Sequence, residues 1–443
     1  MKTFAMGGVH PEENKISTEA VIEQFPLPKT AVVLMTQHLG APATPCVAKG
    51  DKVKVGQLIG KAEAFMCANV HSPYSGTVAK IEGCKDAFGI VKPAIYINVE
   101  GDEWEPTIDR SDTIVRECTL EPKAITEKLK EMGIVGLGGA TFPAHIKYSI
   151  APDKKAEYLI INAVECEPYL TSDHRVMMEH AEEICIGVSI LRKALGVPNA
   201  YIGIENNKPG PIATMKAMAA QFEGIIVQPL KVKYPQGAEK QLINAITGRR
   251  VPSGKLPIDV GCVVSNVGTA FAVYEAIQKN KPLIQNILTV TGKKLPSQHN
   301  YQVRVGTTYA DLIAHSIGTL PPTTGKIISG GPMMGKAVCN LDAPTTKGAS
   351  SVLVIDESEA SRAPESNCIR CGKCMNACPM GLEPYLFSAL VKNDRIEEAG
   401  AHNILDCIEC GCCFFSCPAN KPLLDEIRLG KNKYRAIMMA KKK

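Results

Sequence analysis

Two cysteine-rich segments near the C-terminal end of the chain have the residue types and spacing to hold inorganic clusters. Residues 368–379 read CIRCGKCMNACP, and residues 407–418 read CIECGCCFFSCP. Both follow the pattern C-x2-C-x2-C-x3-C-P, with which proteins ligate pairs of [4Fe-4S] clusters. A thiolate at every third residue lets one loop wrap three corners of a cubic cluster, and the cysteine before proline reaches the neighbouring cluster.

The pattern assigns eight cysteines to two [4Fe-4S] clusters. One cluster takes Cys368, Cys371, Cys374 and Cys417, and the second takes Cys407, Cys410, Cys413 and Cys378. Four thiolates also suit zinc, but zinc sites use two separated C-x2-C pairs rather than a triplet followed by C-P. The letters C-G-C-C offer Cys412 or Cys413 as third ligand, and the spacing favours Cys413. Because two adjacent clusters carry single electrons, the upstream chain is expected to feed them.

The composition is that of an ordinary globular protein. A chain of 443 residues predicts about three domains. The net charge of +5 is mild, and no basic stripe with interleaved aromatic residues indicates nucleic-acid binding. The nine cysteines outside the clusters show no pairing pattern, which favours a reducing compartment. No signal segment and no run of 18 apolar residues is present, so we expect a soluble protein or one held at a membrane by a partner.

The elements that must position this chemistry begin with a compact β region. Alternating segments predict strands over 30–35, 52–65, 71–81 and 91–100. The order K-G-D-x-V-x-x-G-Q-x-I…H-S-P-x-S-G-x-V-x-x-I is similar to the lipoyl/biotinyl barrel-sandwich fold. The expected hairpin, AEAFMCANV at 62–70, has no lysine to carry a prosthetic group, so a purely structural barrel is expected.

An α/β region and two smaller parts follow. Helices are expected over 121–132, 174–195 and 211–222, alternating with strands over 158–164, 200–204 and 225–230. Turn signals dominate 231–261, and 264–277 reads as a loop entering a helix. From 286 to about 355, short strands and a helix over 309–317 suggest a β-grasp module. A linker at 358–364 leads to the cysteine runs, which flank a helix over 383–399, and the basic tail after it is either solvated or a partner-facing helix.

A glycine loop in the α/β region is a candidate anion site. Gly136, Gly138 and Gly139 permit backbone that a Cβ forbids, and Pro143 suits the first turn of a helix. Free N–H groups at that helix start attract an anion such as a flavin phosphate, and Lys147 can add a charge. The loop follows a helix rather than a strand, so it is not a dinucleotide fingerprint. An ordinary tight turn before a capped helix remains the alternative.

Two further polar segments follow expected strands. In N-A-V-E-C-E-P, Asn162 can contact a heterocycle, and Glu165 and Glu167, two residues apart, are expected to point to one side. Strand ends are common ligand positions in α/β sheets, although a solvated acidic turn is the alternative. The segment 265–269, S-N-V-G-T, is a polar cap before a helix, and an ordinary helix cap is again the alternative.

Together these segments resemble a known family. G-L-G-G-A-T-F-P-x-x-x-K, Y-L-I-I-N-A-x-E-x-E-P and S-N-V-x-T, in that order, are similar to the flavoprotein subunit of respiratory complex I, which binds FMN and NADH. The opening G-G-V-H-P-E-E-N-K, the barrel and the two cysteine runs resemble the RnfC family, one of the components of Rnf complexes, more closely. Rnf complexes are membrane-bound, ion-translocating ferredoxin:NAD+ oxidoreductases. The cobalamin reductase of propanediol-utilisation microcompartments shares the layout.

The resemblance implies roles for named residues. The cofactor-binding set for FMN and NAD(H) is Gly136, Gly138, Gly139, Lys147, Asn162, Glu165, Glu167, Gly237, Glu239, Asn266 and Thr269. Leu137 and Val164 depart from the complex I pattern, which has Arg and Asp there. A cation and an anion that complex I places near its flavin are therefore absent from this chain.

The expected architecture is multidomain, with α/β and β parts. The expected domains are an N-terminal extension with a lipoyl-like barrel sandwich (1–110), a Rossmann-like FMN- and NADH-binding domain (111–280), a β-grasp module of the SLBB type (281–357) and a helical dicluster ferredoxin domain (358–443). The expected function is the NAD(H)-side electron-transfer subunit of an Rnf complex. Its expected partners are membrane-embedded and ferredoxin-like subunits, at the cytoplasmic side of the cell membrane. A corrinoid reductase and a non-enzymatic iron–sulfur adaptor are the alternatives.

Overall fold

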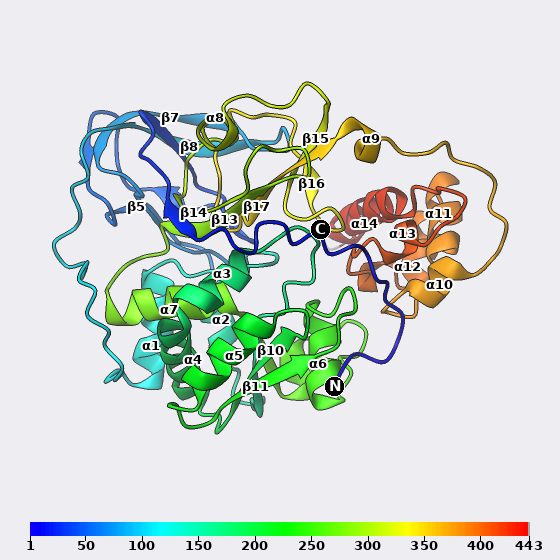
Figure 1. Cartoon of the computed structure of the whole chain (residues 1–443), viewed down its shortest axis with the longest axis horizontal. Helices are drawn as coiled ribbons and strands as arrows, with labels where there is room; N and C mark the ends of the chain where they lie inside the picture. The colour runs from blue at the N-terminus through cyan, green and yellow to red at the C-terminus, as the bar shows by residue number, and fades with distance from the viewer. Residues whose placement is uncertain (442–443) are drawn as a thin grey trace.

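The computed structural model describes residues 1–441 and begins with a barrel sandwich (Figure 1). Its two antiparallel sheets have the orders β2-β8-β7-β4 and β3-β5-β6. The strands are β2 Thr30–Leu34, β3 Thr44–Pro45, β4 Lys52–Val53, β5 Leu58–Lys61, β6 Val70–His71, β7 Gly76–Lys85 and β8 Val91–Val99. Alternation along β2 and β8 sends Val33, Ile95 and Ile97 into one core with Ile59 and Val70 of the facing sheet.

The second part is an α/β layer around a parallel sheet of order β11-β10-β9-β12. Its strands are β9 Tyr158–Asn162, β10 Ala200–Glu205, β11 Ile225–Leu230 and β12 Cys262–Asn266. Its helices are α1 Pro122–Glu131, α2 Ala144–Tyr148, α3 Ser172–Glu179, α4 Ala181–Leu195, α5 Pro209–Ala219, α6 Glu239–Thr247, the 3-10 turn Pro257–Val260 and α7 Val267–Gln278. Because all four strands are parallel, their carboxyl ends share one edge.

The third part is a mixed six-stranded sheet of order β1-β14-β13-β17-β15-β16. Its elements are β1 Ile22–Gln24, β13 Gln285–Thr291, β14 His299–Arg304, α8 Tyr309–Ile317, β15 Thr324–Ser329, β16 Lys336–Ala337 and β17 Ser351–Asp356. The helix expected over 309–317 is present with those bounds. Strand β1 pairs in parallel with β14, so the sheet includes a strand from the N-terminal segment.

The C-terminal part is helical and contains an internal repeat. Its elements are α9 Glu357–Ala360, α10 Lys373–Ala377, α11 Pro384–Lys392, α12 Ile396–Ala401, the 3-10 turn Ile404–Asp406, α13 Cys412–Phe415 and α14 Leu423–Ala440. Each cysteine run turns at a left-handed glycine, Gly372 with φ +73° or Gly411 with φ +78°, before a short helix. A longer helix follows each run, and α11 packs against α14. The final two residues of the expected region 358–443 lie outside the described residues.

Residues 1–24, which we call the N-terminal strap, run across three parts of the molecule. Lys2 and Val9 form isolated bridges with Leu230 and Tyr234 of the α/β part. The N–H of Gly8 donates to the carbonyl of Ala377 in the C-terminal part, at 2.9 Å. The strap then reaches the six-stranded sheet as β1. This segment therefore connects parts that lie far apart in the sequence.

Some expected elements differ in the structure, including the following three. Residues 231–261, expected as loop, contain the nine-residue helix α6, which lies between the turn at Gly237 and the left-handed Gly248 that ends it. The helix expected over 174–195 is two helices, because His180 leaves the helical conformation with φ −129° and ψ 35°. The helix expected over 383–399 breaks at Asp394, whose φ is +55°. Among residues 1–441, no helix combines the length and apolarity needed to cross a membrane.

Candidate flavin and iron–sulfur sites

The expected flavin segments meet at the carboxyl edge of the parallel sheet, between β9 and β12. Asn162 and Asn266 end these strands as register partners, and Asn266 Nδ2 donates to the Asn162 carbonyl at 3.3 Å. The glycine loop joins them, because the N–H of Leu137 donates to Thr269 Oγ1 at 2.8 Å. From β9 the chain continues to β10 on one side, while β12 lies on the other. Such a switch point is where open α/β sheets bind ligands.

The glycine loop lies against the start of α7. Gly138 has φ +71°, and a Cβ there would lie 2.7 Å from Asn266 Nδ2, so both the backbone and the space require glycine. Asn266 caps α7, since its Oδ1 accepts from the N–H of Gly268 at 2.8 Å. Helix α7 has twelve residues, whereas α2 behind Pro143 has only five. The stronger positive helix end at this edge is therefore that of α7.

Two side-chain contacts bring the 237–239 segment into the same edge. Asn162 Nδ2 donates to the carbonyl of Gly237 at 2.8 Å. Lys147 Nζ donates to Glu239 Oε1 at 2.9 Å and to the Val264 carbonyl at 3.0 Å. The structure therefore gathers the glycine loop, Lys147, Asn162, the 237–239 turn and the start of α7 at one edge. Lys147 is already paired with a carboxylate, so its charge is partly neutralised.

The two glutamates after β9 do not share one direction. Glu165 has φ +47°, so the strand's alternation ends before it. Its Oε1 accepts from the N–H of Asp173 at 2.7 Å, within the α/β part. The carboxylate of Glu167 instead accepts from the N–H groups of Met333 and Met334, at 3.0 and 2.7 Å, in the turn between β15 and β16. The expectation that both carboxylates point to one side is wrong, because the backbone turns between them.

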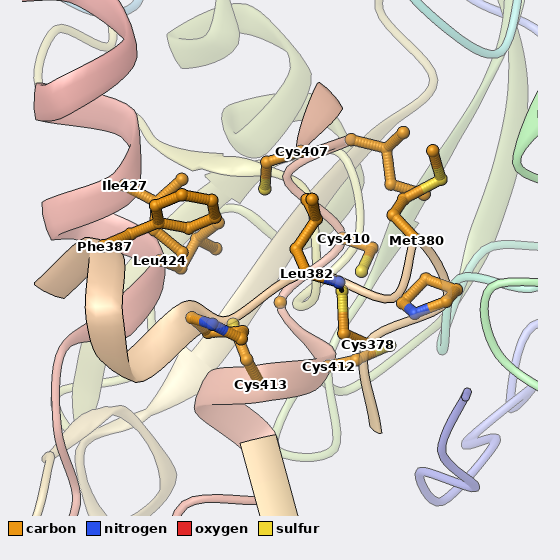
Figure 2. Close-up of a pocket in the computed structure, with 14 residues that line it drawn as sticks. Cys378, Met380, Leu382, Phe387, Cys407, Cys410, Cys412, Cys413, Leu424 and Ile427 are labelled. Atoms are coloured by element: carbon orange, nitrogen blue, oxygen red, sulfur yellow. Dashed lines mark hydrogen bonds between the residues drawn. The ribbon is translucent and has the colours of Figure 1, made fainter. Parts of the chain in front are cut away.

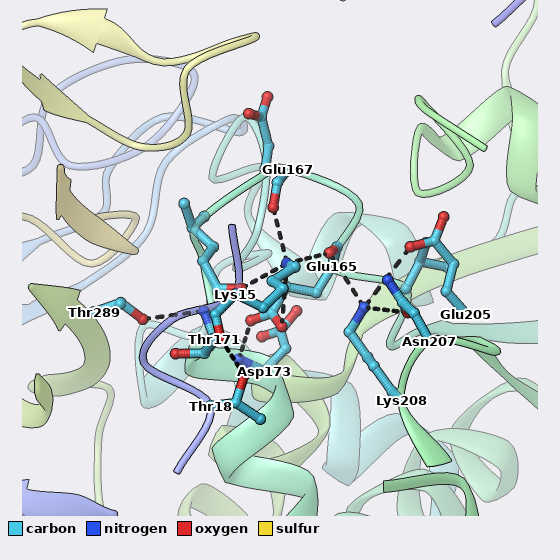
Figure 3. A network of polar contacts seen from close by, with 12 residues as sticks. Lys15, Thr18, Glu165, Glu167, Thr171, Asp173, Glu205, Asn207, Lys208 and Thr289 are labelled. Atoms are coloured by element: carbon cyan, nitrogen blue, oxygen red, sulfur yellow. Dashed lines mark hydrogen bonds and ion pairs between the residues drawn. The ribbon is translucent and has the colours of Figure 1, made fainter. Parts of the chain in front are cut away.

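A buried polar network supports the segment that carries these glutamates (Figure 3). Lys15 Nζ, from the N-terminal strap, donates to the carbonyls of Glu165, Glu167 and Leu170 at 2.8, 2.9 and 2.6 Å. Its ammonium also lies 3.7 Å from Glu165 Oε2. On the other side, Lys208 Nζ donates to the Glu165 carbonyl at 3.4 Å and pairs with Glu205 at 3.7 Å. The hydrogen bonds from the two lysines to carbonyls hold a backbone in which the positive φ of Glu165 is costly for a residue other than glycine.

Asp173 is a polar residue of this edge that the sequence patterns did not reveal. Its Oδ2 accepts from Asn266 Nδ2 at 2.8 Å. Burial raises the pKa of the Asp173 carboxyl to about 7, and the nearby charge of Glu165 adds to the rise. In the sequence, Asp173 stands only in the S-D-H-R segment at the start of a helix. That segment is also typical of an ordinary helix with an acidic first turn. The sequence patterns also did not indicate Lys15, Lys208 or Glu205, because the burial of a charged side chain depends on partners that are distant in the sequence.

The second cluster's four expected cysteines surround one cavity. Cys378, from the first run, lines it with Cys407, Cys410, Cys413 and also Cys412 of the second run, as Figure 2 shows. The remaining walls are mainly apolar, from Leu382, Phe387, Leu424 and Ile427. Burial raises the pKa of Cys407 to about 11, and Cys410 and Cys378 add to the rise. Four thiolates crowded there need positive charge to offset them, which the irons of a cluster supply.

The first cluster's expected cysteines lie closer to the surface. Cys368 and Cys371 are exposed, and Cys374 and Cys417 are partly buried. Burial raises the pKa of the Cys374 thiol, and Cys417 lies near enough for its charge to add to the rise. Cys378 therefore lies with the cysteines of the second run, and Cys417 lies near Cys374 of the first run. Within residues 1–441, no three His, Cys, Asp or Glu side chains converge tightly enough to chelate a single metal ion.

One tyrosine joins the two candidate sites. Tyr234, 2% exposed, donates from its hydroxyl to the Cys410 carbonyl at 2.8 Å. The same hydroxyl lies 3.3 Å from Glu167 Oε1. Cys412 is fully buried beside it, with Sγ 4.0 Å from the Tyr234 carbonyl. The cavity of the second cluster is thus packed directly on the 234–239 turn that contacts Asn162.

Three family matches cover most of the chain. Residues 3–102 match the family described as RnfC Barrel sandwich hybrid domain, and residues 129–275 match Nuo51 FMN-binding domain. Residues 367–421 match 4Fe-4S dicluster domain. These matches confirm the predicted barrel sandwich, flavin-binding part and dicluster part in their predicted order.

Full-length relatives are also found. A subunit of the proton-translocating ferredoxin:NAD(+) oxidoreductase complex of Clostridium ljungdahlii is 47% identical, over 98% of this chain and 95% of its own. The equivalent subunit of the Na(+)-translocating ferredoxin:NAD(+) oxidoreductase complex of Acetobacterium woodii is 41% identical, over 96% of both chains. Among solved structures, a NAD+-reducing [NiFe]-hydrogenase in the air-oxidized state aligns with TM-score 0.48 and 18% identity, over 63% of this chain and 54% of its own.

Proposed function

This chain belongs to the RnfC family of ion-translocating ferredoxin:NAD(+) oxidoreductase complexes, and from that premise we propose how its residues serve the reaction. It is an oxidoreductase subunit with an FMN-binding part and a part for [4Fe-4S] clusters. Its function is electron transfer between NAD(H), FMN and these clusters within an Rnf complex. When bound, FMN exchanges electron pairs with NAD(H) and single electrons with clusters, and the protein supplies binding and orientation.

The flavin site is proposed at the edge between β9 and β12. Gly136, Gly138 and Gly139 would let the backbone approach the cofactor, and the capped start of α7 at Asn266 would face its phosphate. The other proposed contacts are Lys147, Asn162, Glu165, Gly237, Glu239 and Thr269. The buried apolar Leu137 and Val164 stand where complex I has charged residues, so these contacts would be more neutral here.

Glu167 is proposed in a different role from the other flavin-site residues. Its carboxylate is held by the 333–334 turn and lies beside the Tyr234 hydroxyl, which in turn contacts Cys410. Burial raises the pKa of the Glu167 carboxyl. We therefore assign it to the junction between the flavin part, the six-stranded sheet and the second cluster.

The cluster ligands are proposed as the pattern predicts, with Cys412 left out. The single observation that carries this proposal is the cavity that Cys378 of the first run lines together with cysteines of the second run. Cys412 also lines this cavity, and it is left out because the C-x2-C spacing favours Cys413. Cys374 lies beside Cys417, which fits the complementary set with Cys368 and Cys371. The cysteines of the second cluster contact the flavin part through Tyr234, and those of the first cluster lie closer to the surface. This order fits electron exchange between the first cluster and an external partner.

The proposed setting is the cytoplasmic face of the cell membrane. The chain would be held there by membrane-embedded and ferredoxin-like subunits, with NAD(H) as its small-molecule partner. The six-stranded part is proposed as a β-grasp module of the SLBB type, spanning about 281–357, with β1 as an added edge strand.

The test is cofactor content together with activity. Purified anaerobically, the chain should contain about eight iron atoms, bind FMN and catalyse reduction of ferricyanide by NADH. Iron without flavin, and no oxidation of NADH after incubation with FMN, would refute the nucleotide half of the proposal. Flavin with zinc in place of iron would refute the cluster half.

A further inference from the structure

The two cysteine runs offer an internal comparison, because each position of one has a counterpart in the other. Ile369 and Arg370 correspond to Ile408 and Glu409, and Gly372 and Lys373 to Gly411 and Cys412. The backbones agree as well, since Arg370 and Glu409 have φ values of +56° and +57°. A difference in the surroundings of two matching positions therefore reflects what packs on each run rather than its conformation.

The second run is covered by the rest of the chain. Ile408 packs in the cluster that contains Tyr234 and Val9. At Gly411, an added Cβ would lie 2.9 Å from the carbonyl of Met333. Cys412 is fully buried against the Tyr234 carbonyl. This run presents its turn to the flavin part and to the six-stranded sheet.

The matching surface of the first run is open. Ile369 is 68% exposed, although its counterpart Ile408 is packed, and Met375 on the same turn is 39% exposed. A Cβ added at Gly372 would meet no atom of the described chain within 4 Å. We call Ile369, Arg370, Lys373 and Met375 the first-run face. The two exposed apolar side chains lie on the same run as the exposed Cys368 and Cys371.

The charges of the two runs also differ. Glu409 is satisfied inside the chain, with Lys431 Nζ at 2.6 Å and Arg428 Nε at 3.2 Å. Arg370 and Lys373 are exposed, and neither makes a side-chain hydrogen bond or an ion pair within residues 1–441. The first-run face therefore has an apolar centre and two cations that the described chain leaves unpaired. Its complement is a surface with an apolar spot and carboxylates around it.

We propose that the first-run face docks a redox protein that has an acidic surface and its own one-electron centre. This rests on the proposed function, in which Cys368, Cys371, Cys374 and Cys417 hold a cluster directly beneath the face. Each encounter passes one electron. In the direction of NAD+ reduction, two encounters deliver two electrons, which with one proton convert NAD+ to NADH. The donor is oxidised because it loses these two electrons. The flavin part docks on one run, and the external partner docks on the other.

A binding measurement tests the proposal without relying on turnover. The probe is an acidic 2[4Fe-4S] ferredoxin, titrated against the immobilised full-length chain with its clusters and FMN in place. The double variant Arg370→Glu/Lys373→Glu should raise the Kd for ferredoxin by about tenfold or more at low salt, because like charges then face each other. Glutamate is compatible with the backbone at position 370, since its counterpart Glu409 has nearly the same positive φ. Ile369→Ser should weaken binding about severalfold through the loss of apolar contact.

Charge-matched variants on distant surfaces are the control. Lys123→Glu/Lys216→Glu changes the net charge equally, on exposed positions of α1 and α5. This control variant should bind ferredoxin with a Kd within about twofold of the wild-type value. The affinity of the wild-type chain should fall steeply as salt is raised, whereas the affinity of Arg370→Glu/Lys373→Glu should not. NADH:ferricyanide activity and the EPR signals of both clusters should be unchanged in every variant.

The outcomes separate this proposal from the proposed function. Equal weakening by both double variants, or an unchanged Kd in Arg370→Glu/Lys373→Glu, would overturn the docking face. Absence of ferredoxin binding to a wild-type chain that reduces ferricyanide with NADH would overturn it too, while leaving the function intact. A wild-type chain that lacks flavin or clusters contradicts the proposed function instead.

Discussion

The hydroxyl of Tyr234 donates a 2.8 Å hydrogen bond to the carbonyl of Cys410, which joins the turn at the flavin edge to the second cysteine run. Tyr234→Phe removes this bond and leaves a buried carbonyl without it. We expect a loss of about 1–3 kcal/mol in the docking of the C-terminal part. Thermal unfolding and the EPR line shape of the second cluster would measure the loss.

Tyr434→Phe is a suitable control for Tyr234→Phe. Tyr434 packs on Gly400 through its ring, and within residues 1–441 its hydroxyl makes no hydrogen bond. Its removal should change the unfolding temperature little. Equal effects of the two substitutions would show that the Tyr234 hydrogen bond contributes nothing measurable.

Serine substitutions distinguish the two candidate third ligands of the second run. Cys413→Ser should abolish one cluster and leave about four of about eight iron atoms. Cys412→Ser should keep both, because the C-x2-C spacing assigns the third ligand to Cys413 and Cys412 Sγ lies 4.0 Å from the Tyr234 carbonyl. Iron analysis and EPR after reduction would measure this. Loss of a cluster only in Cys412→Ser would reverse the assignment.

Alanine at Gly138 should damage the flavin edge. The residue has φ +71°, and the new Cβ would lie 2.7 Å from Asn266 Nδ2, so the loop must shift. We expect a cost of about 1–2 kcal/mol from the left-handed backbone alone, and a large loss of bound FMN. Flavin fluorescence after release from the protein would measure the content.

Gly139→Ala provides the contrast to Gly138→Ala. A Cβ at Gly139 would contact nothing within 4 Å of the described chain, so the fold should be as stable as wild type. Loss of stability at Gly139 equal to that at Gly138 would contradict the account of the loop. FMN loss at Gly139 without loss of stability would instead mean that the cofactor lies close to that backbone.

Lys347 should make stability depend on pH. It is almost fully buried, and its Nζ donates to the carbonyls of Asn69 and Gly133, both at 2.8 Å. Burial lowers its pKa from 10.5 to about 7. Between these values the unfolded chain binds more protons than the folded one, so the free energy of unfolding rises with pH, by up to about 1.4 kcal/mol per pH unit.

The matched variant for this test is Lys347→Met. It keeps the length of the side chain and removes the titrating group, so the difference in unfolding free energy between variant and wild type should change steadily from about pH 7 to about pH 10. Urea unfolding at several pH values would measure it. A difference that is constant across this range would contradict the lowered pKa.

The sequence predicted the local patterns well and the distant partners poorly. The cysteine runs and the helix over 309–317 could be read because spacing and periodicity are local. Helix α6 was hidden by the turn residues at both of its ends. The directions of Glu165 and Glu167 depend on a left-handed backbone that Lys15, 150 residues away, supports through a carbonyl contact. No pattern within the N-A-V-E-C-E-P segment indicates such a partner.

The N-terminal strap also constrains the order in which the molecule can form. Lys2, Gly8 and Val9 are synthesised early, but their partners Leu230, Tyr234 and Ala377 are synthesised much later. These contacts have long sequence separation, so they add to the loop-closure cost that slows folding. The strap can therefore complete its contacts only after the cysteine-containing part has been made, because Gly8 needs Ala377. In a growing chain, protection from proteases around Gly8 would report that the last part is in place.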